Sequence, residues 1–167
     1  MIERMKVLCV TPVSLLVATS FLALASARAS QAPAPPDGLP DAPGKAVVIR
    51  LCTLCHGTDI IVDTPRTVPV WNETIDLMKS FGAEGSGEDW KTVADYLVTH
   101  LAHLDVNKAT AGDVTLVFGV SEQIAAGVVA YRDKQGGFKT IDDLKKAPDL
   151  DAAKVDALKA RLIFPAN

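Results

Sequence analysis

The spacing of the apolar residues predicts a helical protein. Beyond residue 44, apolar side chains recur every three to four positions, which is the period of an amphipathic helix. No stretch shows the strict alternation that is typical of a half-buried strand. The clearest segment is 86–104, where Ser86 and Asp89 have the spacing of a capping box ahead of an apolar face. We therefore predict an all-α fold, with helices over residues 45–55, 69–81, 86–104, 110–118, 122–134, 141–146 and 152–162.

The first 29 residues have the composition of a secretory signal peptide. Two basic residues precede an apolar run over 7–24, and the small residues Ala27 and Ala29 follow it at the spacing that a signal peptidase recognises. We expect cleavage before Ser30, with a cut after Ala27 as the alternative. The run has about 18 residues, near the length that spans a bilayer, so an uncleaved membrane anchor is the rival interpretation. The expected location of the mature chain is the periplasm.

Composition divides the rest of the chain into three parts. Residues 30–44 contain five prolines and almost no large apolar side chain, which predicts an extended linker. Residues 45–104 and 105–167 each have a globular composition. In the second of these, Gly119, Gly136, Gly137 and Pro148 separate the expected helices. We predict two small helical domains with a boundary near residue 104.

The charge balance does not favour a polyanionic partner. Without residues 1–29, the chain carries 19 acidic and 14 basic residues, a net charge of −5. Residues 105–167 contain nine of each sign. Nonspecific affinity for nucleic acid requires several uncompensated cations. We therefore do not expect nucleic acid to be a partner, and we expect contact with a membrane only if the signal segment stays uncleaved.

Residues 51–57, LCTLCHG, contain the Cys-x-x-Cys-His pattern of covalent haem attachment. The spacing lets the thiols of Cys52 and Cys55 form thioethers with two vinyl groups on one porphyrin edge, while His56 supplies the proximal iron ligand. A redox dithiol and half a zinc site are the alternatives. A dithiol does not need His56, and zinc would need further ligands, for which His100 and His103 are the candidates. We predict one covalently bound haem c.

Residues 44–104 resemble class I c-type cytochrome domains. The resemblance rests on LCTLCHG, on the spacing of Trp71, Met78 and the residues around them, and on Tyr96 near the end of the last expected helix. It implies a fold in which the first and last helices cross beside the haem, and a distal methionine ligand, for which Met78 is the candidate. His100 or His103 would replace Met78 in a bis-histidine haem.

Two further residues are candidates for contacts with the haem itself. Arg66 could pair with a propionate, and Trp71 could donate its indole N–H or pack on the ring edge. An exposed arginine and an ordinary core tryptophan are the alternative interpretations.

Residues 105–164 resemble the helix-hairpin-helix domains of competence-type DNA-uptake proteins. The matching stretch includes AAGVVAYRDKQGGFKTIDDL at residues 125–144. In DNA-binding members a Gly-apolar-Gly turn directs backbone amides at a phosphate. Here the first turn is Gly119-Val120-Ser121, and the second, residues 148–151, has no glycine and carries two aspartates. The resemblance therefore implies a protein-docking module.

These observations favour an exported monohaem cytochrome that transfers single electrons between periplasmic redox partners, such as a dehydrogenase and an acceptor. The alternative is a DNA-binding or DNA-uptake-type helix-hairpin-helix protein that carries a haem domain. A haem enzyme or gas sensor would need an open iron position, which Met78 would close. No catalytic constellation stands out in the sequence, so we do not expect an enzyme.

Overall fold

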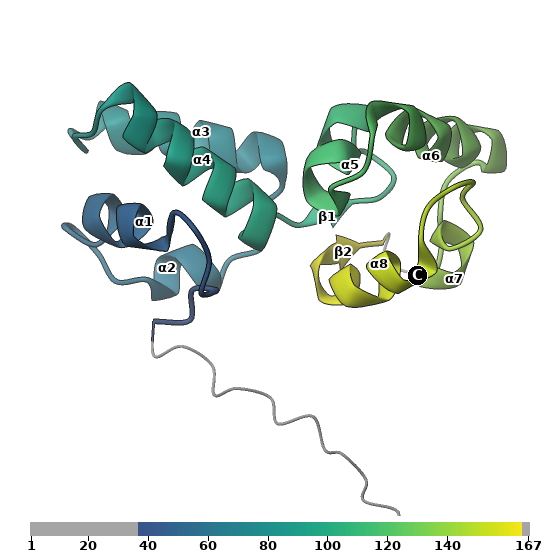
Figure 1. Cartoon of the computed structure of the whole chain (residues 1–167), viewed down its shortest axis with the longest axis horizontal. Helices are drawn as coiled ribbons and strands as arrows, with labels where there is room; N and C mark the ends of the chain where they lie inside the picture. The colour runs from purple at the N-terminus through teal and green to yellow at the C-terminus, as the bar shows by residue number, and fades with distance from the viewer. Residues whose placement is uncertain (1–36, 165–167) are drawn as a thin grey trace, which may run out of the picture. The chain divides into compact units, whose positions relative to one another are not determined.

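The computed structural model describes residues 37–164, which belong to one compact unit and are mostly helical (Figure 1). The signal peptide expected over residues 1–29 and the first part of the expected linker lie outside the described residues. Among the residues described, none of the helices is both long and apolar enough to cross a bilayer.

The first part of the described chain contains four helices, and the longest of them, α4, packs against α1 and α3. Their bounds are α1, Lys45–Cys52; α2, Asp59–Val62; α3, Val68–Ser80; and α4, Gly87–Leu101. Pro69 lies in the first turn of α3, where its missing N–H costs nothing. Helix α2 was not expected from the sequence, because a single turn is too short to show helical periodicity.

The predicted capping box at the start of α4 is confirmed. The Ser86 hydroxyl accepts a hydrogen bond from the Asp89 amide at 3.1 Å, and the Asp89 carboxylate accepts one from the Ser86 amide at 3.0 Å. These two bonds satisfy backbone donors that the first helical turn leaves free. The apolar face that follows buries Val93, Tyr96 and Leu97.

The end of the expected linker is held against the helices. Leu39 is fully buried, although it lies in the segment expected to stay outside the core. The Tyr96 hydroxyl donates to the Pro40 carbonyl oxygen at 2.6 Å, and Lys45 pairs with Asp37 at 3.0 Å. Burial raises the pKa of Tyr96 to about 12. The composition of this segment, rich in proline and alanine, did not predict these contacts with the helices.

The second part contains four helices, a 3-10 turn and two short strands. Their bounds are β1, Leu104–Asp105; α5, Ala111–Phe118; α6, Glu122–Gln135; α7, Ile141–Leu144; α8, Ala152–Leu158; η1, Lys159–Arg161; and β2, Leu162–Ile163. Strands β1 and β2 pair in parallel, with Leu104 opposite Leu162. Strands had not been expected, since two residues are too few to show alternation. Helix α5 packs against both α6 and α8.

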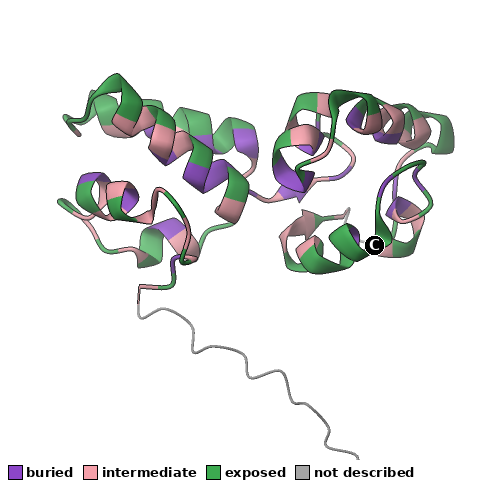
Figure 2. Cartoon of the chain, viewed as in Figure 1, coloured by how far each residue is buried: buried purple, intermediate pink, exposed green. Residues whose placement is uncertain are grey.

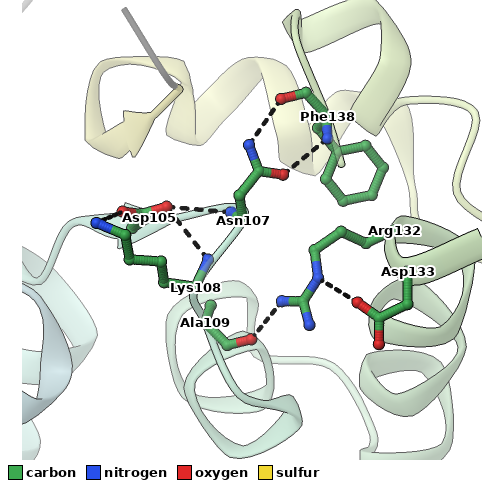
Figure 3. A network of polar contacts seen from close by, with 7 residues as sticks. All are labelled: Asp105, Asn107, Lys108, Ala109, Arg132, Asp133 and Phe138. Carbon is green, nitrogen blue, oxygen red and sulfur yellow. Dashed lines mark hydrogen bonds and ion pairs between the residues drawn. The ribbon is translucent and has the colours of Figure 1, made fainter. Parts of the chain in front are cut away.

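A network of polar contacts fixes the loop before α5 (Figure 3). The Asn107 side chain donates to the Phe138 carbonyl oxygen at 2.9 Å and accepts from the Phe138 amide at 2.7 Å. The Arg132 guanidinium donates to the Ala109 carbonyl oxygen at 2.6 Å and pairs with Asp133 at 2.9 Å. The contacts of Asn107 with Phe138 and of Arg132 with Ala109 join segments that are 31 and 23 residues apart in the chain.

The end of α4 is bound by an arginine from the end of the described chain. Arg161 donates hydrogen bonds to the carbonyl oxygens of Ala102, Thr99 and Val98 at 2.7, 2.8 and 3.1 Å. A helix leaves its last carbonyls without partners, and a cation there also offsets the helix dipole. The buried apolar side chains form one cluster that extends from Leu39 to Val155. Figure 2 shows that buried residues, in purple, occur in both parts of the described chain.

Candidate functional site

The Cys-x-x-Cys-His residues lie at the end of α1 and in the turn after it. Cys52 is partly buried, Cys55 is exposed, and both are free thiols. Burial raises the pKa of the Cys52 thiol. The His56 Nδ1 atom lies 3.0 Å from the Gly57 carbonyl oxygen. If Nδ1 carries the proton, this contact leaves Nε2 free to bind a metal.

A cavity of about 370 Å³ lies beside these residues. Its walls are almost entirely apolar and come from the turn after α1 and from α2, α3 and α4: Cys52, His56, Ile60, Ile61, Arg66, Trp71, Thr74, Ile75, Leu77, Met78, Trp90, Val93 and Leu97. A second hollow, of about 210 Å³, shares Cys52, His56, Met78 and Trp90 with it. Three of the four shared residues, Cys52, His56 and Met78, are candidates that the sequence had selected.

Arg66 and Trp71 supply two of the polar groups in the cavity wall. Trp71 is 3% exposed, and its indole Nε1 is buried without a hydrogen-bond partner. The Arg66 guanidinium lies 4.8 Å from the centre of the Trp71 ring and donates to the carbonyl oxygens of Ile60 and Thr64. A buried N–H without a partner costs free energy, so an acceptor supplied by a ligand would stabilise the site.

The other two histidines of the described chain lie outside the cavity. His100 packs against Tyr96, with ring centroids 5.0 Å apart and the ring planes tilted by 52°. The His103 amide donates to the Arg66 carbonyl oxygen at 2.8 Å, and the imidazole lines a different hollow. Burial lowers the pKa of both imidazoles. The structure thus brings Met78, but neither His100 nor His103, to the cavity that contains His56.

Several wall residues were missed by the sequence-based reasoning. Ile60 and Ile61 belong to the unexpected helix α2, which carries no periodic signal. Trp90, Val93 and Leu97 lie on the predicted apolar face of α4, but only the fold shows that this face lines a cavity.

The hairpin between α5 and α6 is the second candidate site. Gly119 adopts the left-handed conformation with φ of 59°, and the Ser121 hydroxyl caps α6 by accepting from the Ile124 amide. Lys154 of α8 donates to the carbonyl oxygens of Phe118 and Gly119 at 3.2 and 3.1 Å. The sequence gave no sign that this lysine reaches the hairpin.

The hairpin between α7 and α8 has a similar backbone but a different charge. Asp149 occupies the left-handed region with φ of 58°, where Gly119 lies in the first hairpin. The Asp151 carboxylate caps α8 by accepting from the Ala153 amide at 2.8 Å. Two carboxylates at this turn would repel a phosphate, so the first hairpin is the better anion site of the two.

Comparison with known proteins identifies the second part of the chain. Residues 101–163 match the family model described as the helix-hairpin-helix motif. The helix-hairpin-helix motif predicted over residues 105–164 is therefore confirmed, and the matched region begins a few residues earlier, at the end of α4. The chain is a mostly helical protein that contains a helix-hairpin-helix motif.

The matching relatives are much longer proteins. The chain is 32% identical over 66 residues to endonuclease/exonuclease/phosphatase family domain-containing protein 1 of Danio rerio, a match that covers 40% of this chain and 12% of the relative. The Xenopus laevis protein is 38% identical over 56 residues, covering 34% and 10%. The Homo sapiens protein is 30% identical over 63 residues, covering 38% and 11%. No solved structure gives a significant match.

These findings correct the expected class of protein. The chain was expected to be a cytochrome that binds metal and transfers electrons, but the matches are to a helix-hairpin-helix motif and to proteins named for a nuclease and phosphatase domain. Within residues 37–164, no three His, Cys, Asp or Glu side chains converge to hold a metal ion. The expected metal binding is therefore not supported by any cluster of protein ligands.

The expected partners are also corrected. The sequence was taken to disfavour nucleic acid and to favour a periplasmic redox protein or dehydrogenase. The helix-hairpin-helix motif typically binds nucleic acid, which overturns both expectations. The physical reason is that such motifs contact phosphates through backbone amides at a hairpin, so a balanced net charge does not exclude binding.

Proposed function

We propose that the chain is an exported nucleic-acid-binding protein of the helix-hairpin-helix type, and that it is not an enzyme. The observation that carries this proposal is the match of residues 101–163, together with the hairpin at Gly119–Ser121. Backbone amides at the start of α6 can donate to a phosphate oxygen, and the helix dipole favours negative charge there. Lys154 would add a cation beside them.

The number of cations at the hairpin sets the expected strength of binding. Lys154 contacts this hairpin, and one cation would release few counterions, so the affinity should be modest. Phosphate contacts carry no sequence information, so binding should show little sequence preference.

Fluorescence anisotropy with a labelled DNA duplex tests the proposal. Binding should weaken as salt rises, and Lys154→Ala should reduce the slope of log K against log salt by about one. Lys159→Ala is the matched control, because Lys159 is exposed and lies outside the hairpin. Absence of duplex binding by the wild-type chain at low salt would refute the proposal.

We also propose that residues 45–104 carry one covalently attached haem. The arrangement of the cavity supports this: Cys52 and His56 line it, Cys55 lines the adjoining hollow, and Met78 lines both. A haem needs no cluster of three protein ligands, since the porphyrin itself would hold the iron and only His56 and Met78 would be needed as protein ligands. When bound, it would supply an iron that can change oxidation state by one electron.

The residues present fit such a group. Thioethers would form at Cys52 and Cys55, His56 would be the proximal ligand, and Met78 would be the distal one. The buried Trp71 N–H lacks a partner and the Arg66 guanidinium lies over the same ring, so together they suit a propionate carboxylate.

Covalent attachment is tested by expression with a cytochrome c maturation system, followed by extraction with acid acetone. The pigment should stay with the wild-type polypeptide and be lost from the variant with both Cys52→Ser and Cys55→Ser. Extraction of the pigment from the wild-type chain would refute the attachment while leaving the nucleic-acid proposal intact.

A further inference from the structure

A hollow of about 210 Å³ lies at the C-terminal end of α6, away from the hairpin. Its walls come from the last turn of α6, the glycine turn after it and α7: Tyr131, Gln135, Gly137, Phe138, Lys139, Asp143 and Lys146. None of these residues belongs to the haem cavity or to the hairpin at Gly119. The set combines two aromatic rings, a side-chain amide, two ammonium groups and one carboxylate.

The aromatic wall is fixed in place. The Tyr131 and Phe138 rings lie nearly parallel, with centroids 6.2 Å apart and an interplanar angle of 25°. Phe138 is 1% exposed, and its backbone is held by both hydrogen bonds of Asn107. Tyr131 is only partly buried. The hollow therefore has an aromatic side chain at its wall with a rigid support behind it.

The charge of the hollow is net positive by one. The Asp143 carboxylate accepts from the Lys146 ammonium at 3.1 Å and from the amides of Lys139 and Thr140 at 3.3 and 3.1 Å. Its oxygens are thus already engaged. The Lys139 ammonium forms no ion pair with any of residues 37–164 and is exposed. Two ammonium groups facing one satisfied carboxylate can accommodate a phosphate.

We propose that this hollow binds one nucleotide, with the base stacked on Tyr131 and the phosphate held by Lys139 and Lys146. Gln135 carries both a donor and an acceptor, as the edge of a base does. Stacking accepts any base, because every base has a π face. Such a nucleotide can belong to a single strand or be free in solution. We assign it to a single strand, and this assignment rests on the proposed nucleic-acid binding.

The position relative to the hairpin supports a strand. Helix α6 has 14 residues and is about 21 Å long, with the hairpin at its first residue and the hollow at its last turn. A paired base is not free to stack on a protein side chain, whereas an unpaired one is. The hollow therefore selects single-stranded over duplex nucleic acid, at a site separate from the phosphate contact of the hairpin.

The experiment measures the anisotropy of labelled oligothymidylate with the full-length chain, alongside the same strand in a duplex. Tyr131→Leu, which keeps an apolar side chain of similar volume, should weaken binding of the single strand about ten-fold, while Tyr131→Phe should change it less than about two-fold. Lys139→Gln should lower the salt slope by about one, and Lys134→Gln, in the last turn of α6 but outside the hollow, should not.

Each outcome distinguishes the two proposals. If Tyr131→Leu and Lys139→Gln bind the strand like the wild type, the hollow is not a nucleotide site, although the duplex affinity of the hairpin stands. Binding of thymidine monophosphate but not of the strand, with the same dependence on Tyr131, supports the nucleotide chemistry and overturns the strand as its source. If the wild-type chain binds neither the duplex, nor the single strand, nor thymidine monophosphate, both proposals are refuted. Lys139 is exposed, so its variant tests the idea even if Tyr131→Leu unfolds.

Discussion

Asn107 has a small side chain, but its replacement should strongly destabilise the second part of the chain. Its side chain makes two hydrogen bonds to the Phe138 backbone, at 2.9 and 2.7 Å. Asn107→Ala removes both and leaves the Phe138 N–H and C=O without partners. At about 1 kcal/mol for each neutral bond, plus the cost of the unpaired groups, the loss should be about 2–4 kcal/mol. The melting temperature should fall by about 10 °C.

Asn107→Asp tests the two hydrogen bonds individually, because it keeps one and replaces the other by a repulsive contact. A carboxylate still accepts from the Phe138 amide, but its second oxygen then faces the Phe138 carbonyl oxygen, where the amide of Asn107 donates. Only the protonated carboxyl can donate there, so folding should raise the pKa of the new Asp above its usual value of about 3.9. A raised pKa means that stability is lost as pH rises through the folded-state value. The variant should therefore be least stable at neutral pH and recover toward the wild type below about pH 4.

Urea denaturation followed by far-UV circular dichroism measures both effects. Asn72→Ala is the matched control, because Asn72 is exposed on α3 and should change stability by less than about 0.5 kcal/mol. The reasoning is refuted if Asn107→Ala costs less than about 1 kcal/mol, or if the stability deficit of Asn107→Asp is independent of pH.

Three further changes test other contacts. Arg161→Ala should cost about 3 kcal/mol in chemical denaturation, since three charge-assisted bonds to the end of α4 are lost; a cost below about 1 kcal/mol would contradict this. Tyr96→Phe should cost about 1 kcal/mol at pH 7, because the Pro40 carbonyl oxygen loses its donor. Because the folded-state pKa of Tyr96 is about 12 against about 10 unfolded, the wild type should lose stability between those pH values while the variant does not. Gly119→Ala should cost about 1 kcal/mol through its φ of 59°, whereas Gly127→Ala, in the interior of α6 with open space around it, should gain up to about 1 kcal/mol; equal thermal shifts would contradict the assignment.

The helices were predictable because their signals are local. Apolar spacing and the capping box of Ser86 and Asp89 are properties of neighbouring residues, and the structure places α3 and α4 within a few residues of the prediction. Helix α2 and the strand pair β1–β2 were not predictable, because each is too short to show a period. The pairing of Leu104 with Leu162 depends on a contact between distant segments.

The candidate sites also combine features that are local in the sequence with features that depend on tertiary packing. The pattern around Cys52 and His56 is local in the sequence, and Met78 could be chosen because the resemblance to c-type cytochrome domains implies a methionine ligand. The contact of Lys154 with the hairpin, and the unpaired Trp71 indole in a cavity wall, depend on tertiary packing. Residue types and spacing could therefore nominate ligands, but only the fold could exclude His100 and His103 from the cavity.

The expectation that nucleic acid is not a partner was wrong because a net charge counts every charged side chain as free. In residues 105–164, many carboxylates are already satisfied: Asp113 and Asp143 complete capping boxes, Asp151 caps α8, and Asp105, Asp133 and Asp156 form ion pairs. A carboxylate at a helix N-terminus is offset by the dipole of that helix.

The cations are distributed differently. Within the described residues, the basic side chains of this part that form no ion pair with a carboxylate are Lys134, Lys139, Lys154, Lys159 and Arg161. The carboxylates left with neither a cap nor an ion pair are Glu122, Asp142 and Asp149. The potential that a phosphate meets depends on these unengaged groups and falls off over about one Debye length. A neutral sum is therefore compatible with a first hairpin that has Lys154 as well as Glu122 and a second that has the carboxylate of Asp149, and the Lys154→Ala variant measures the contribution of that cation directly.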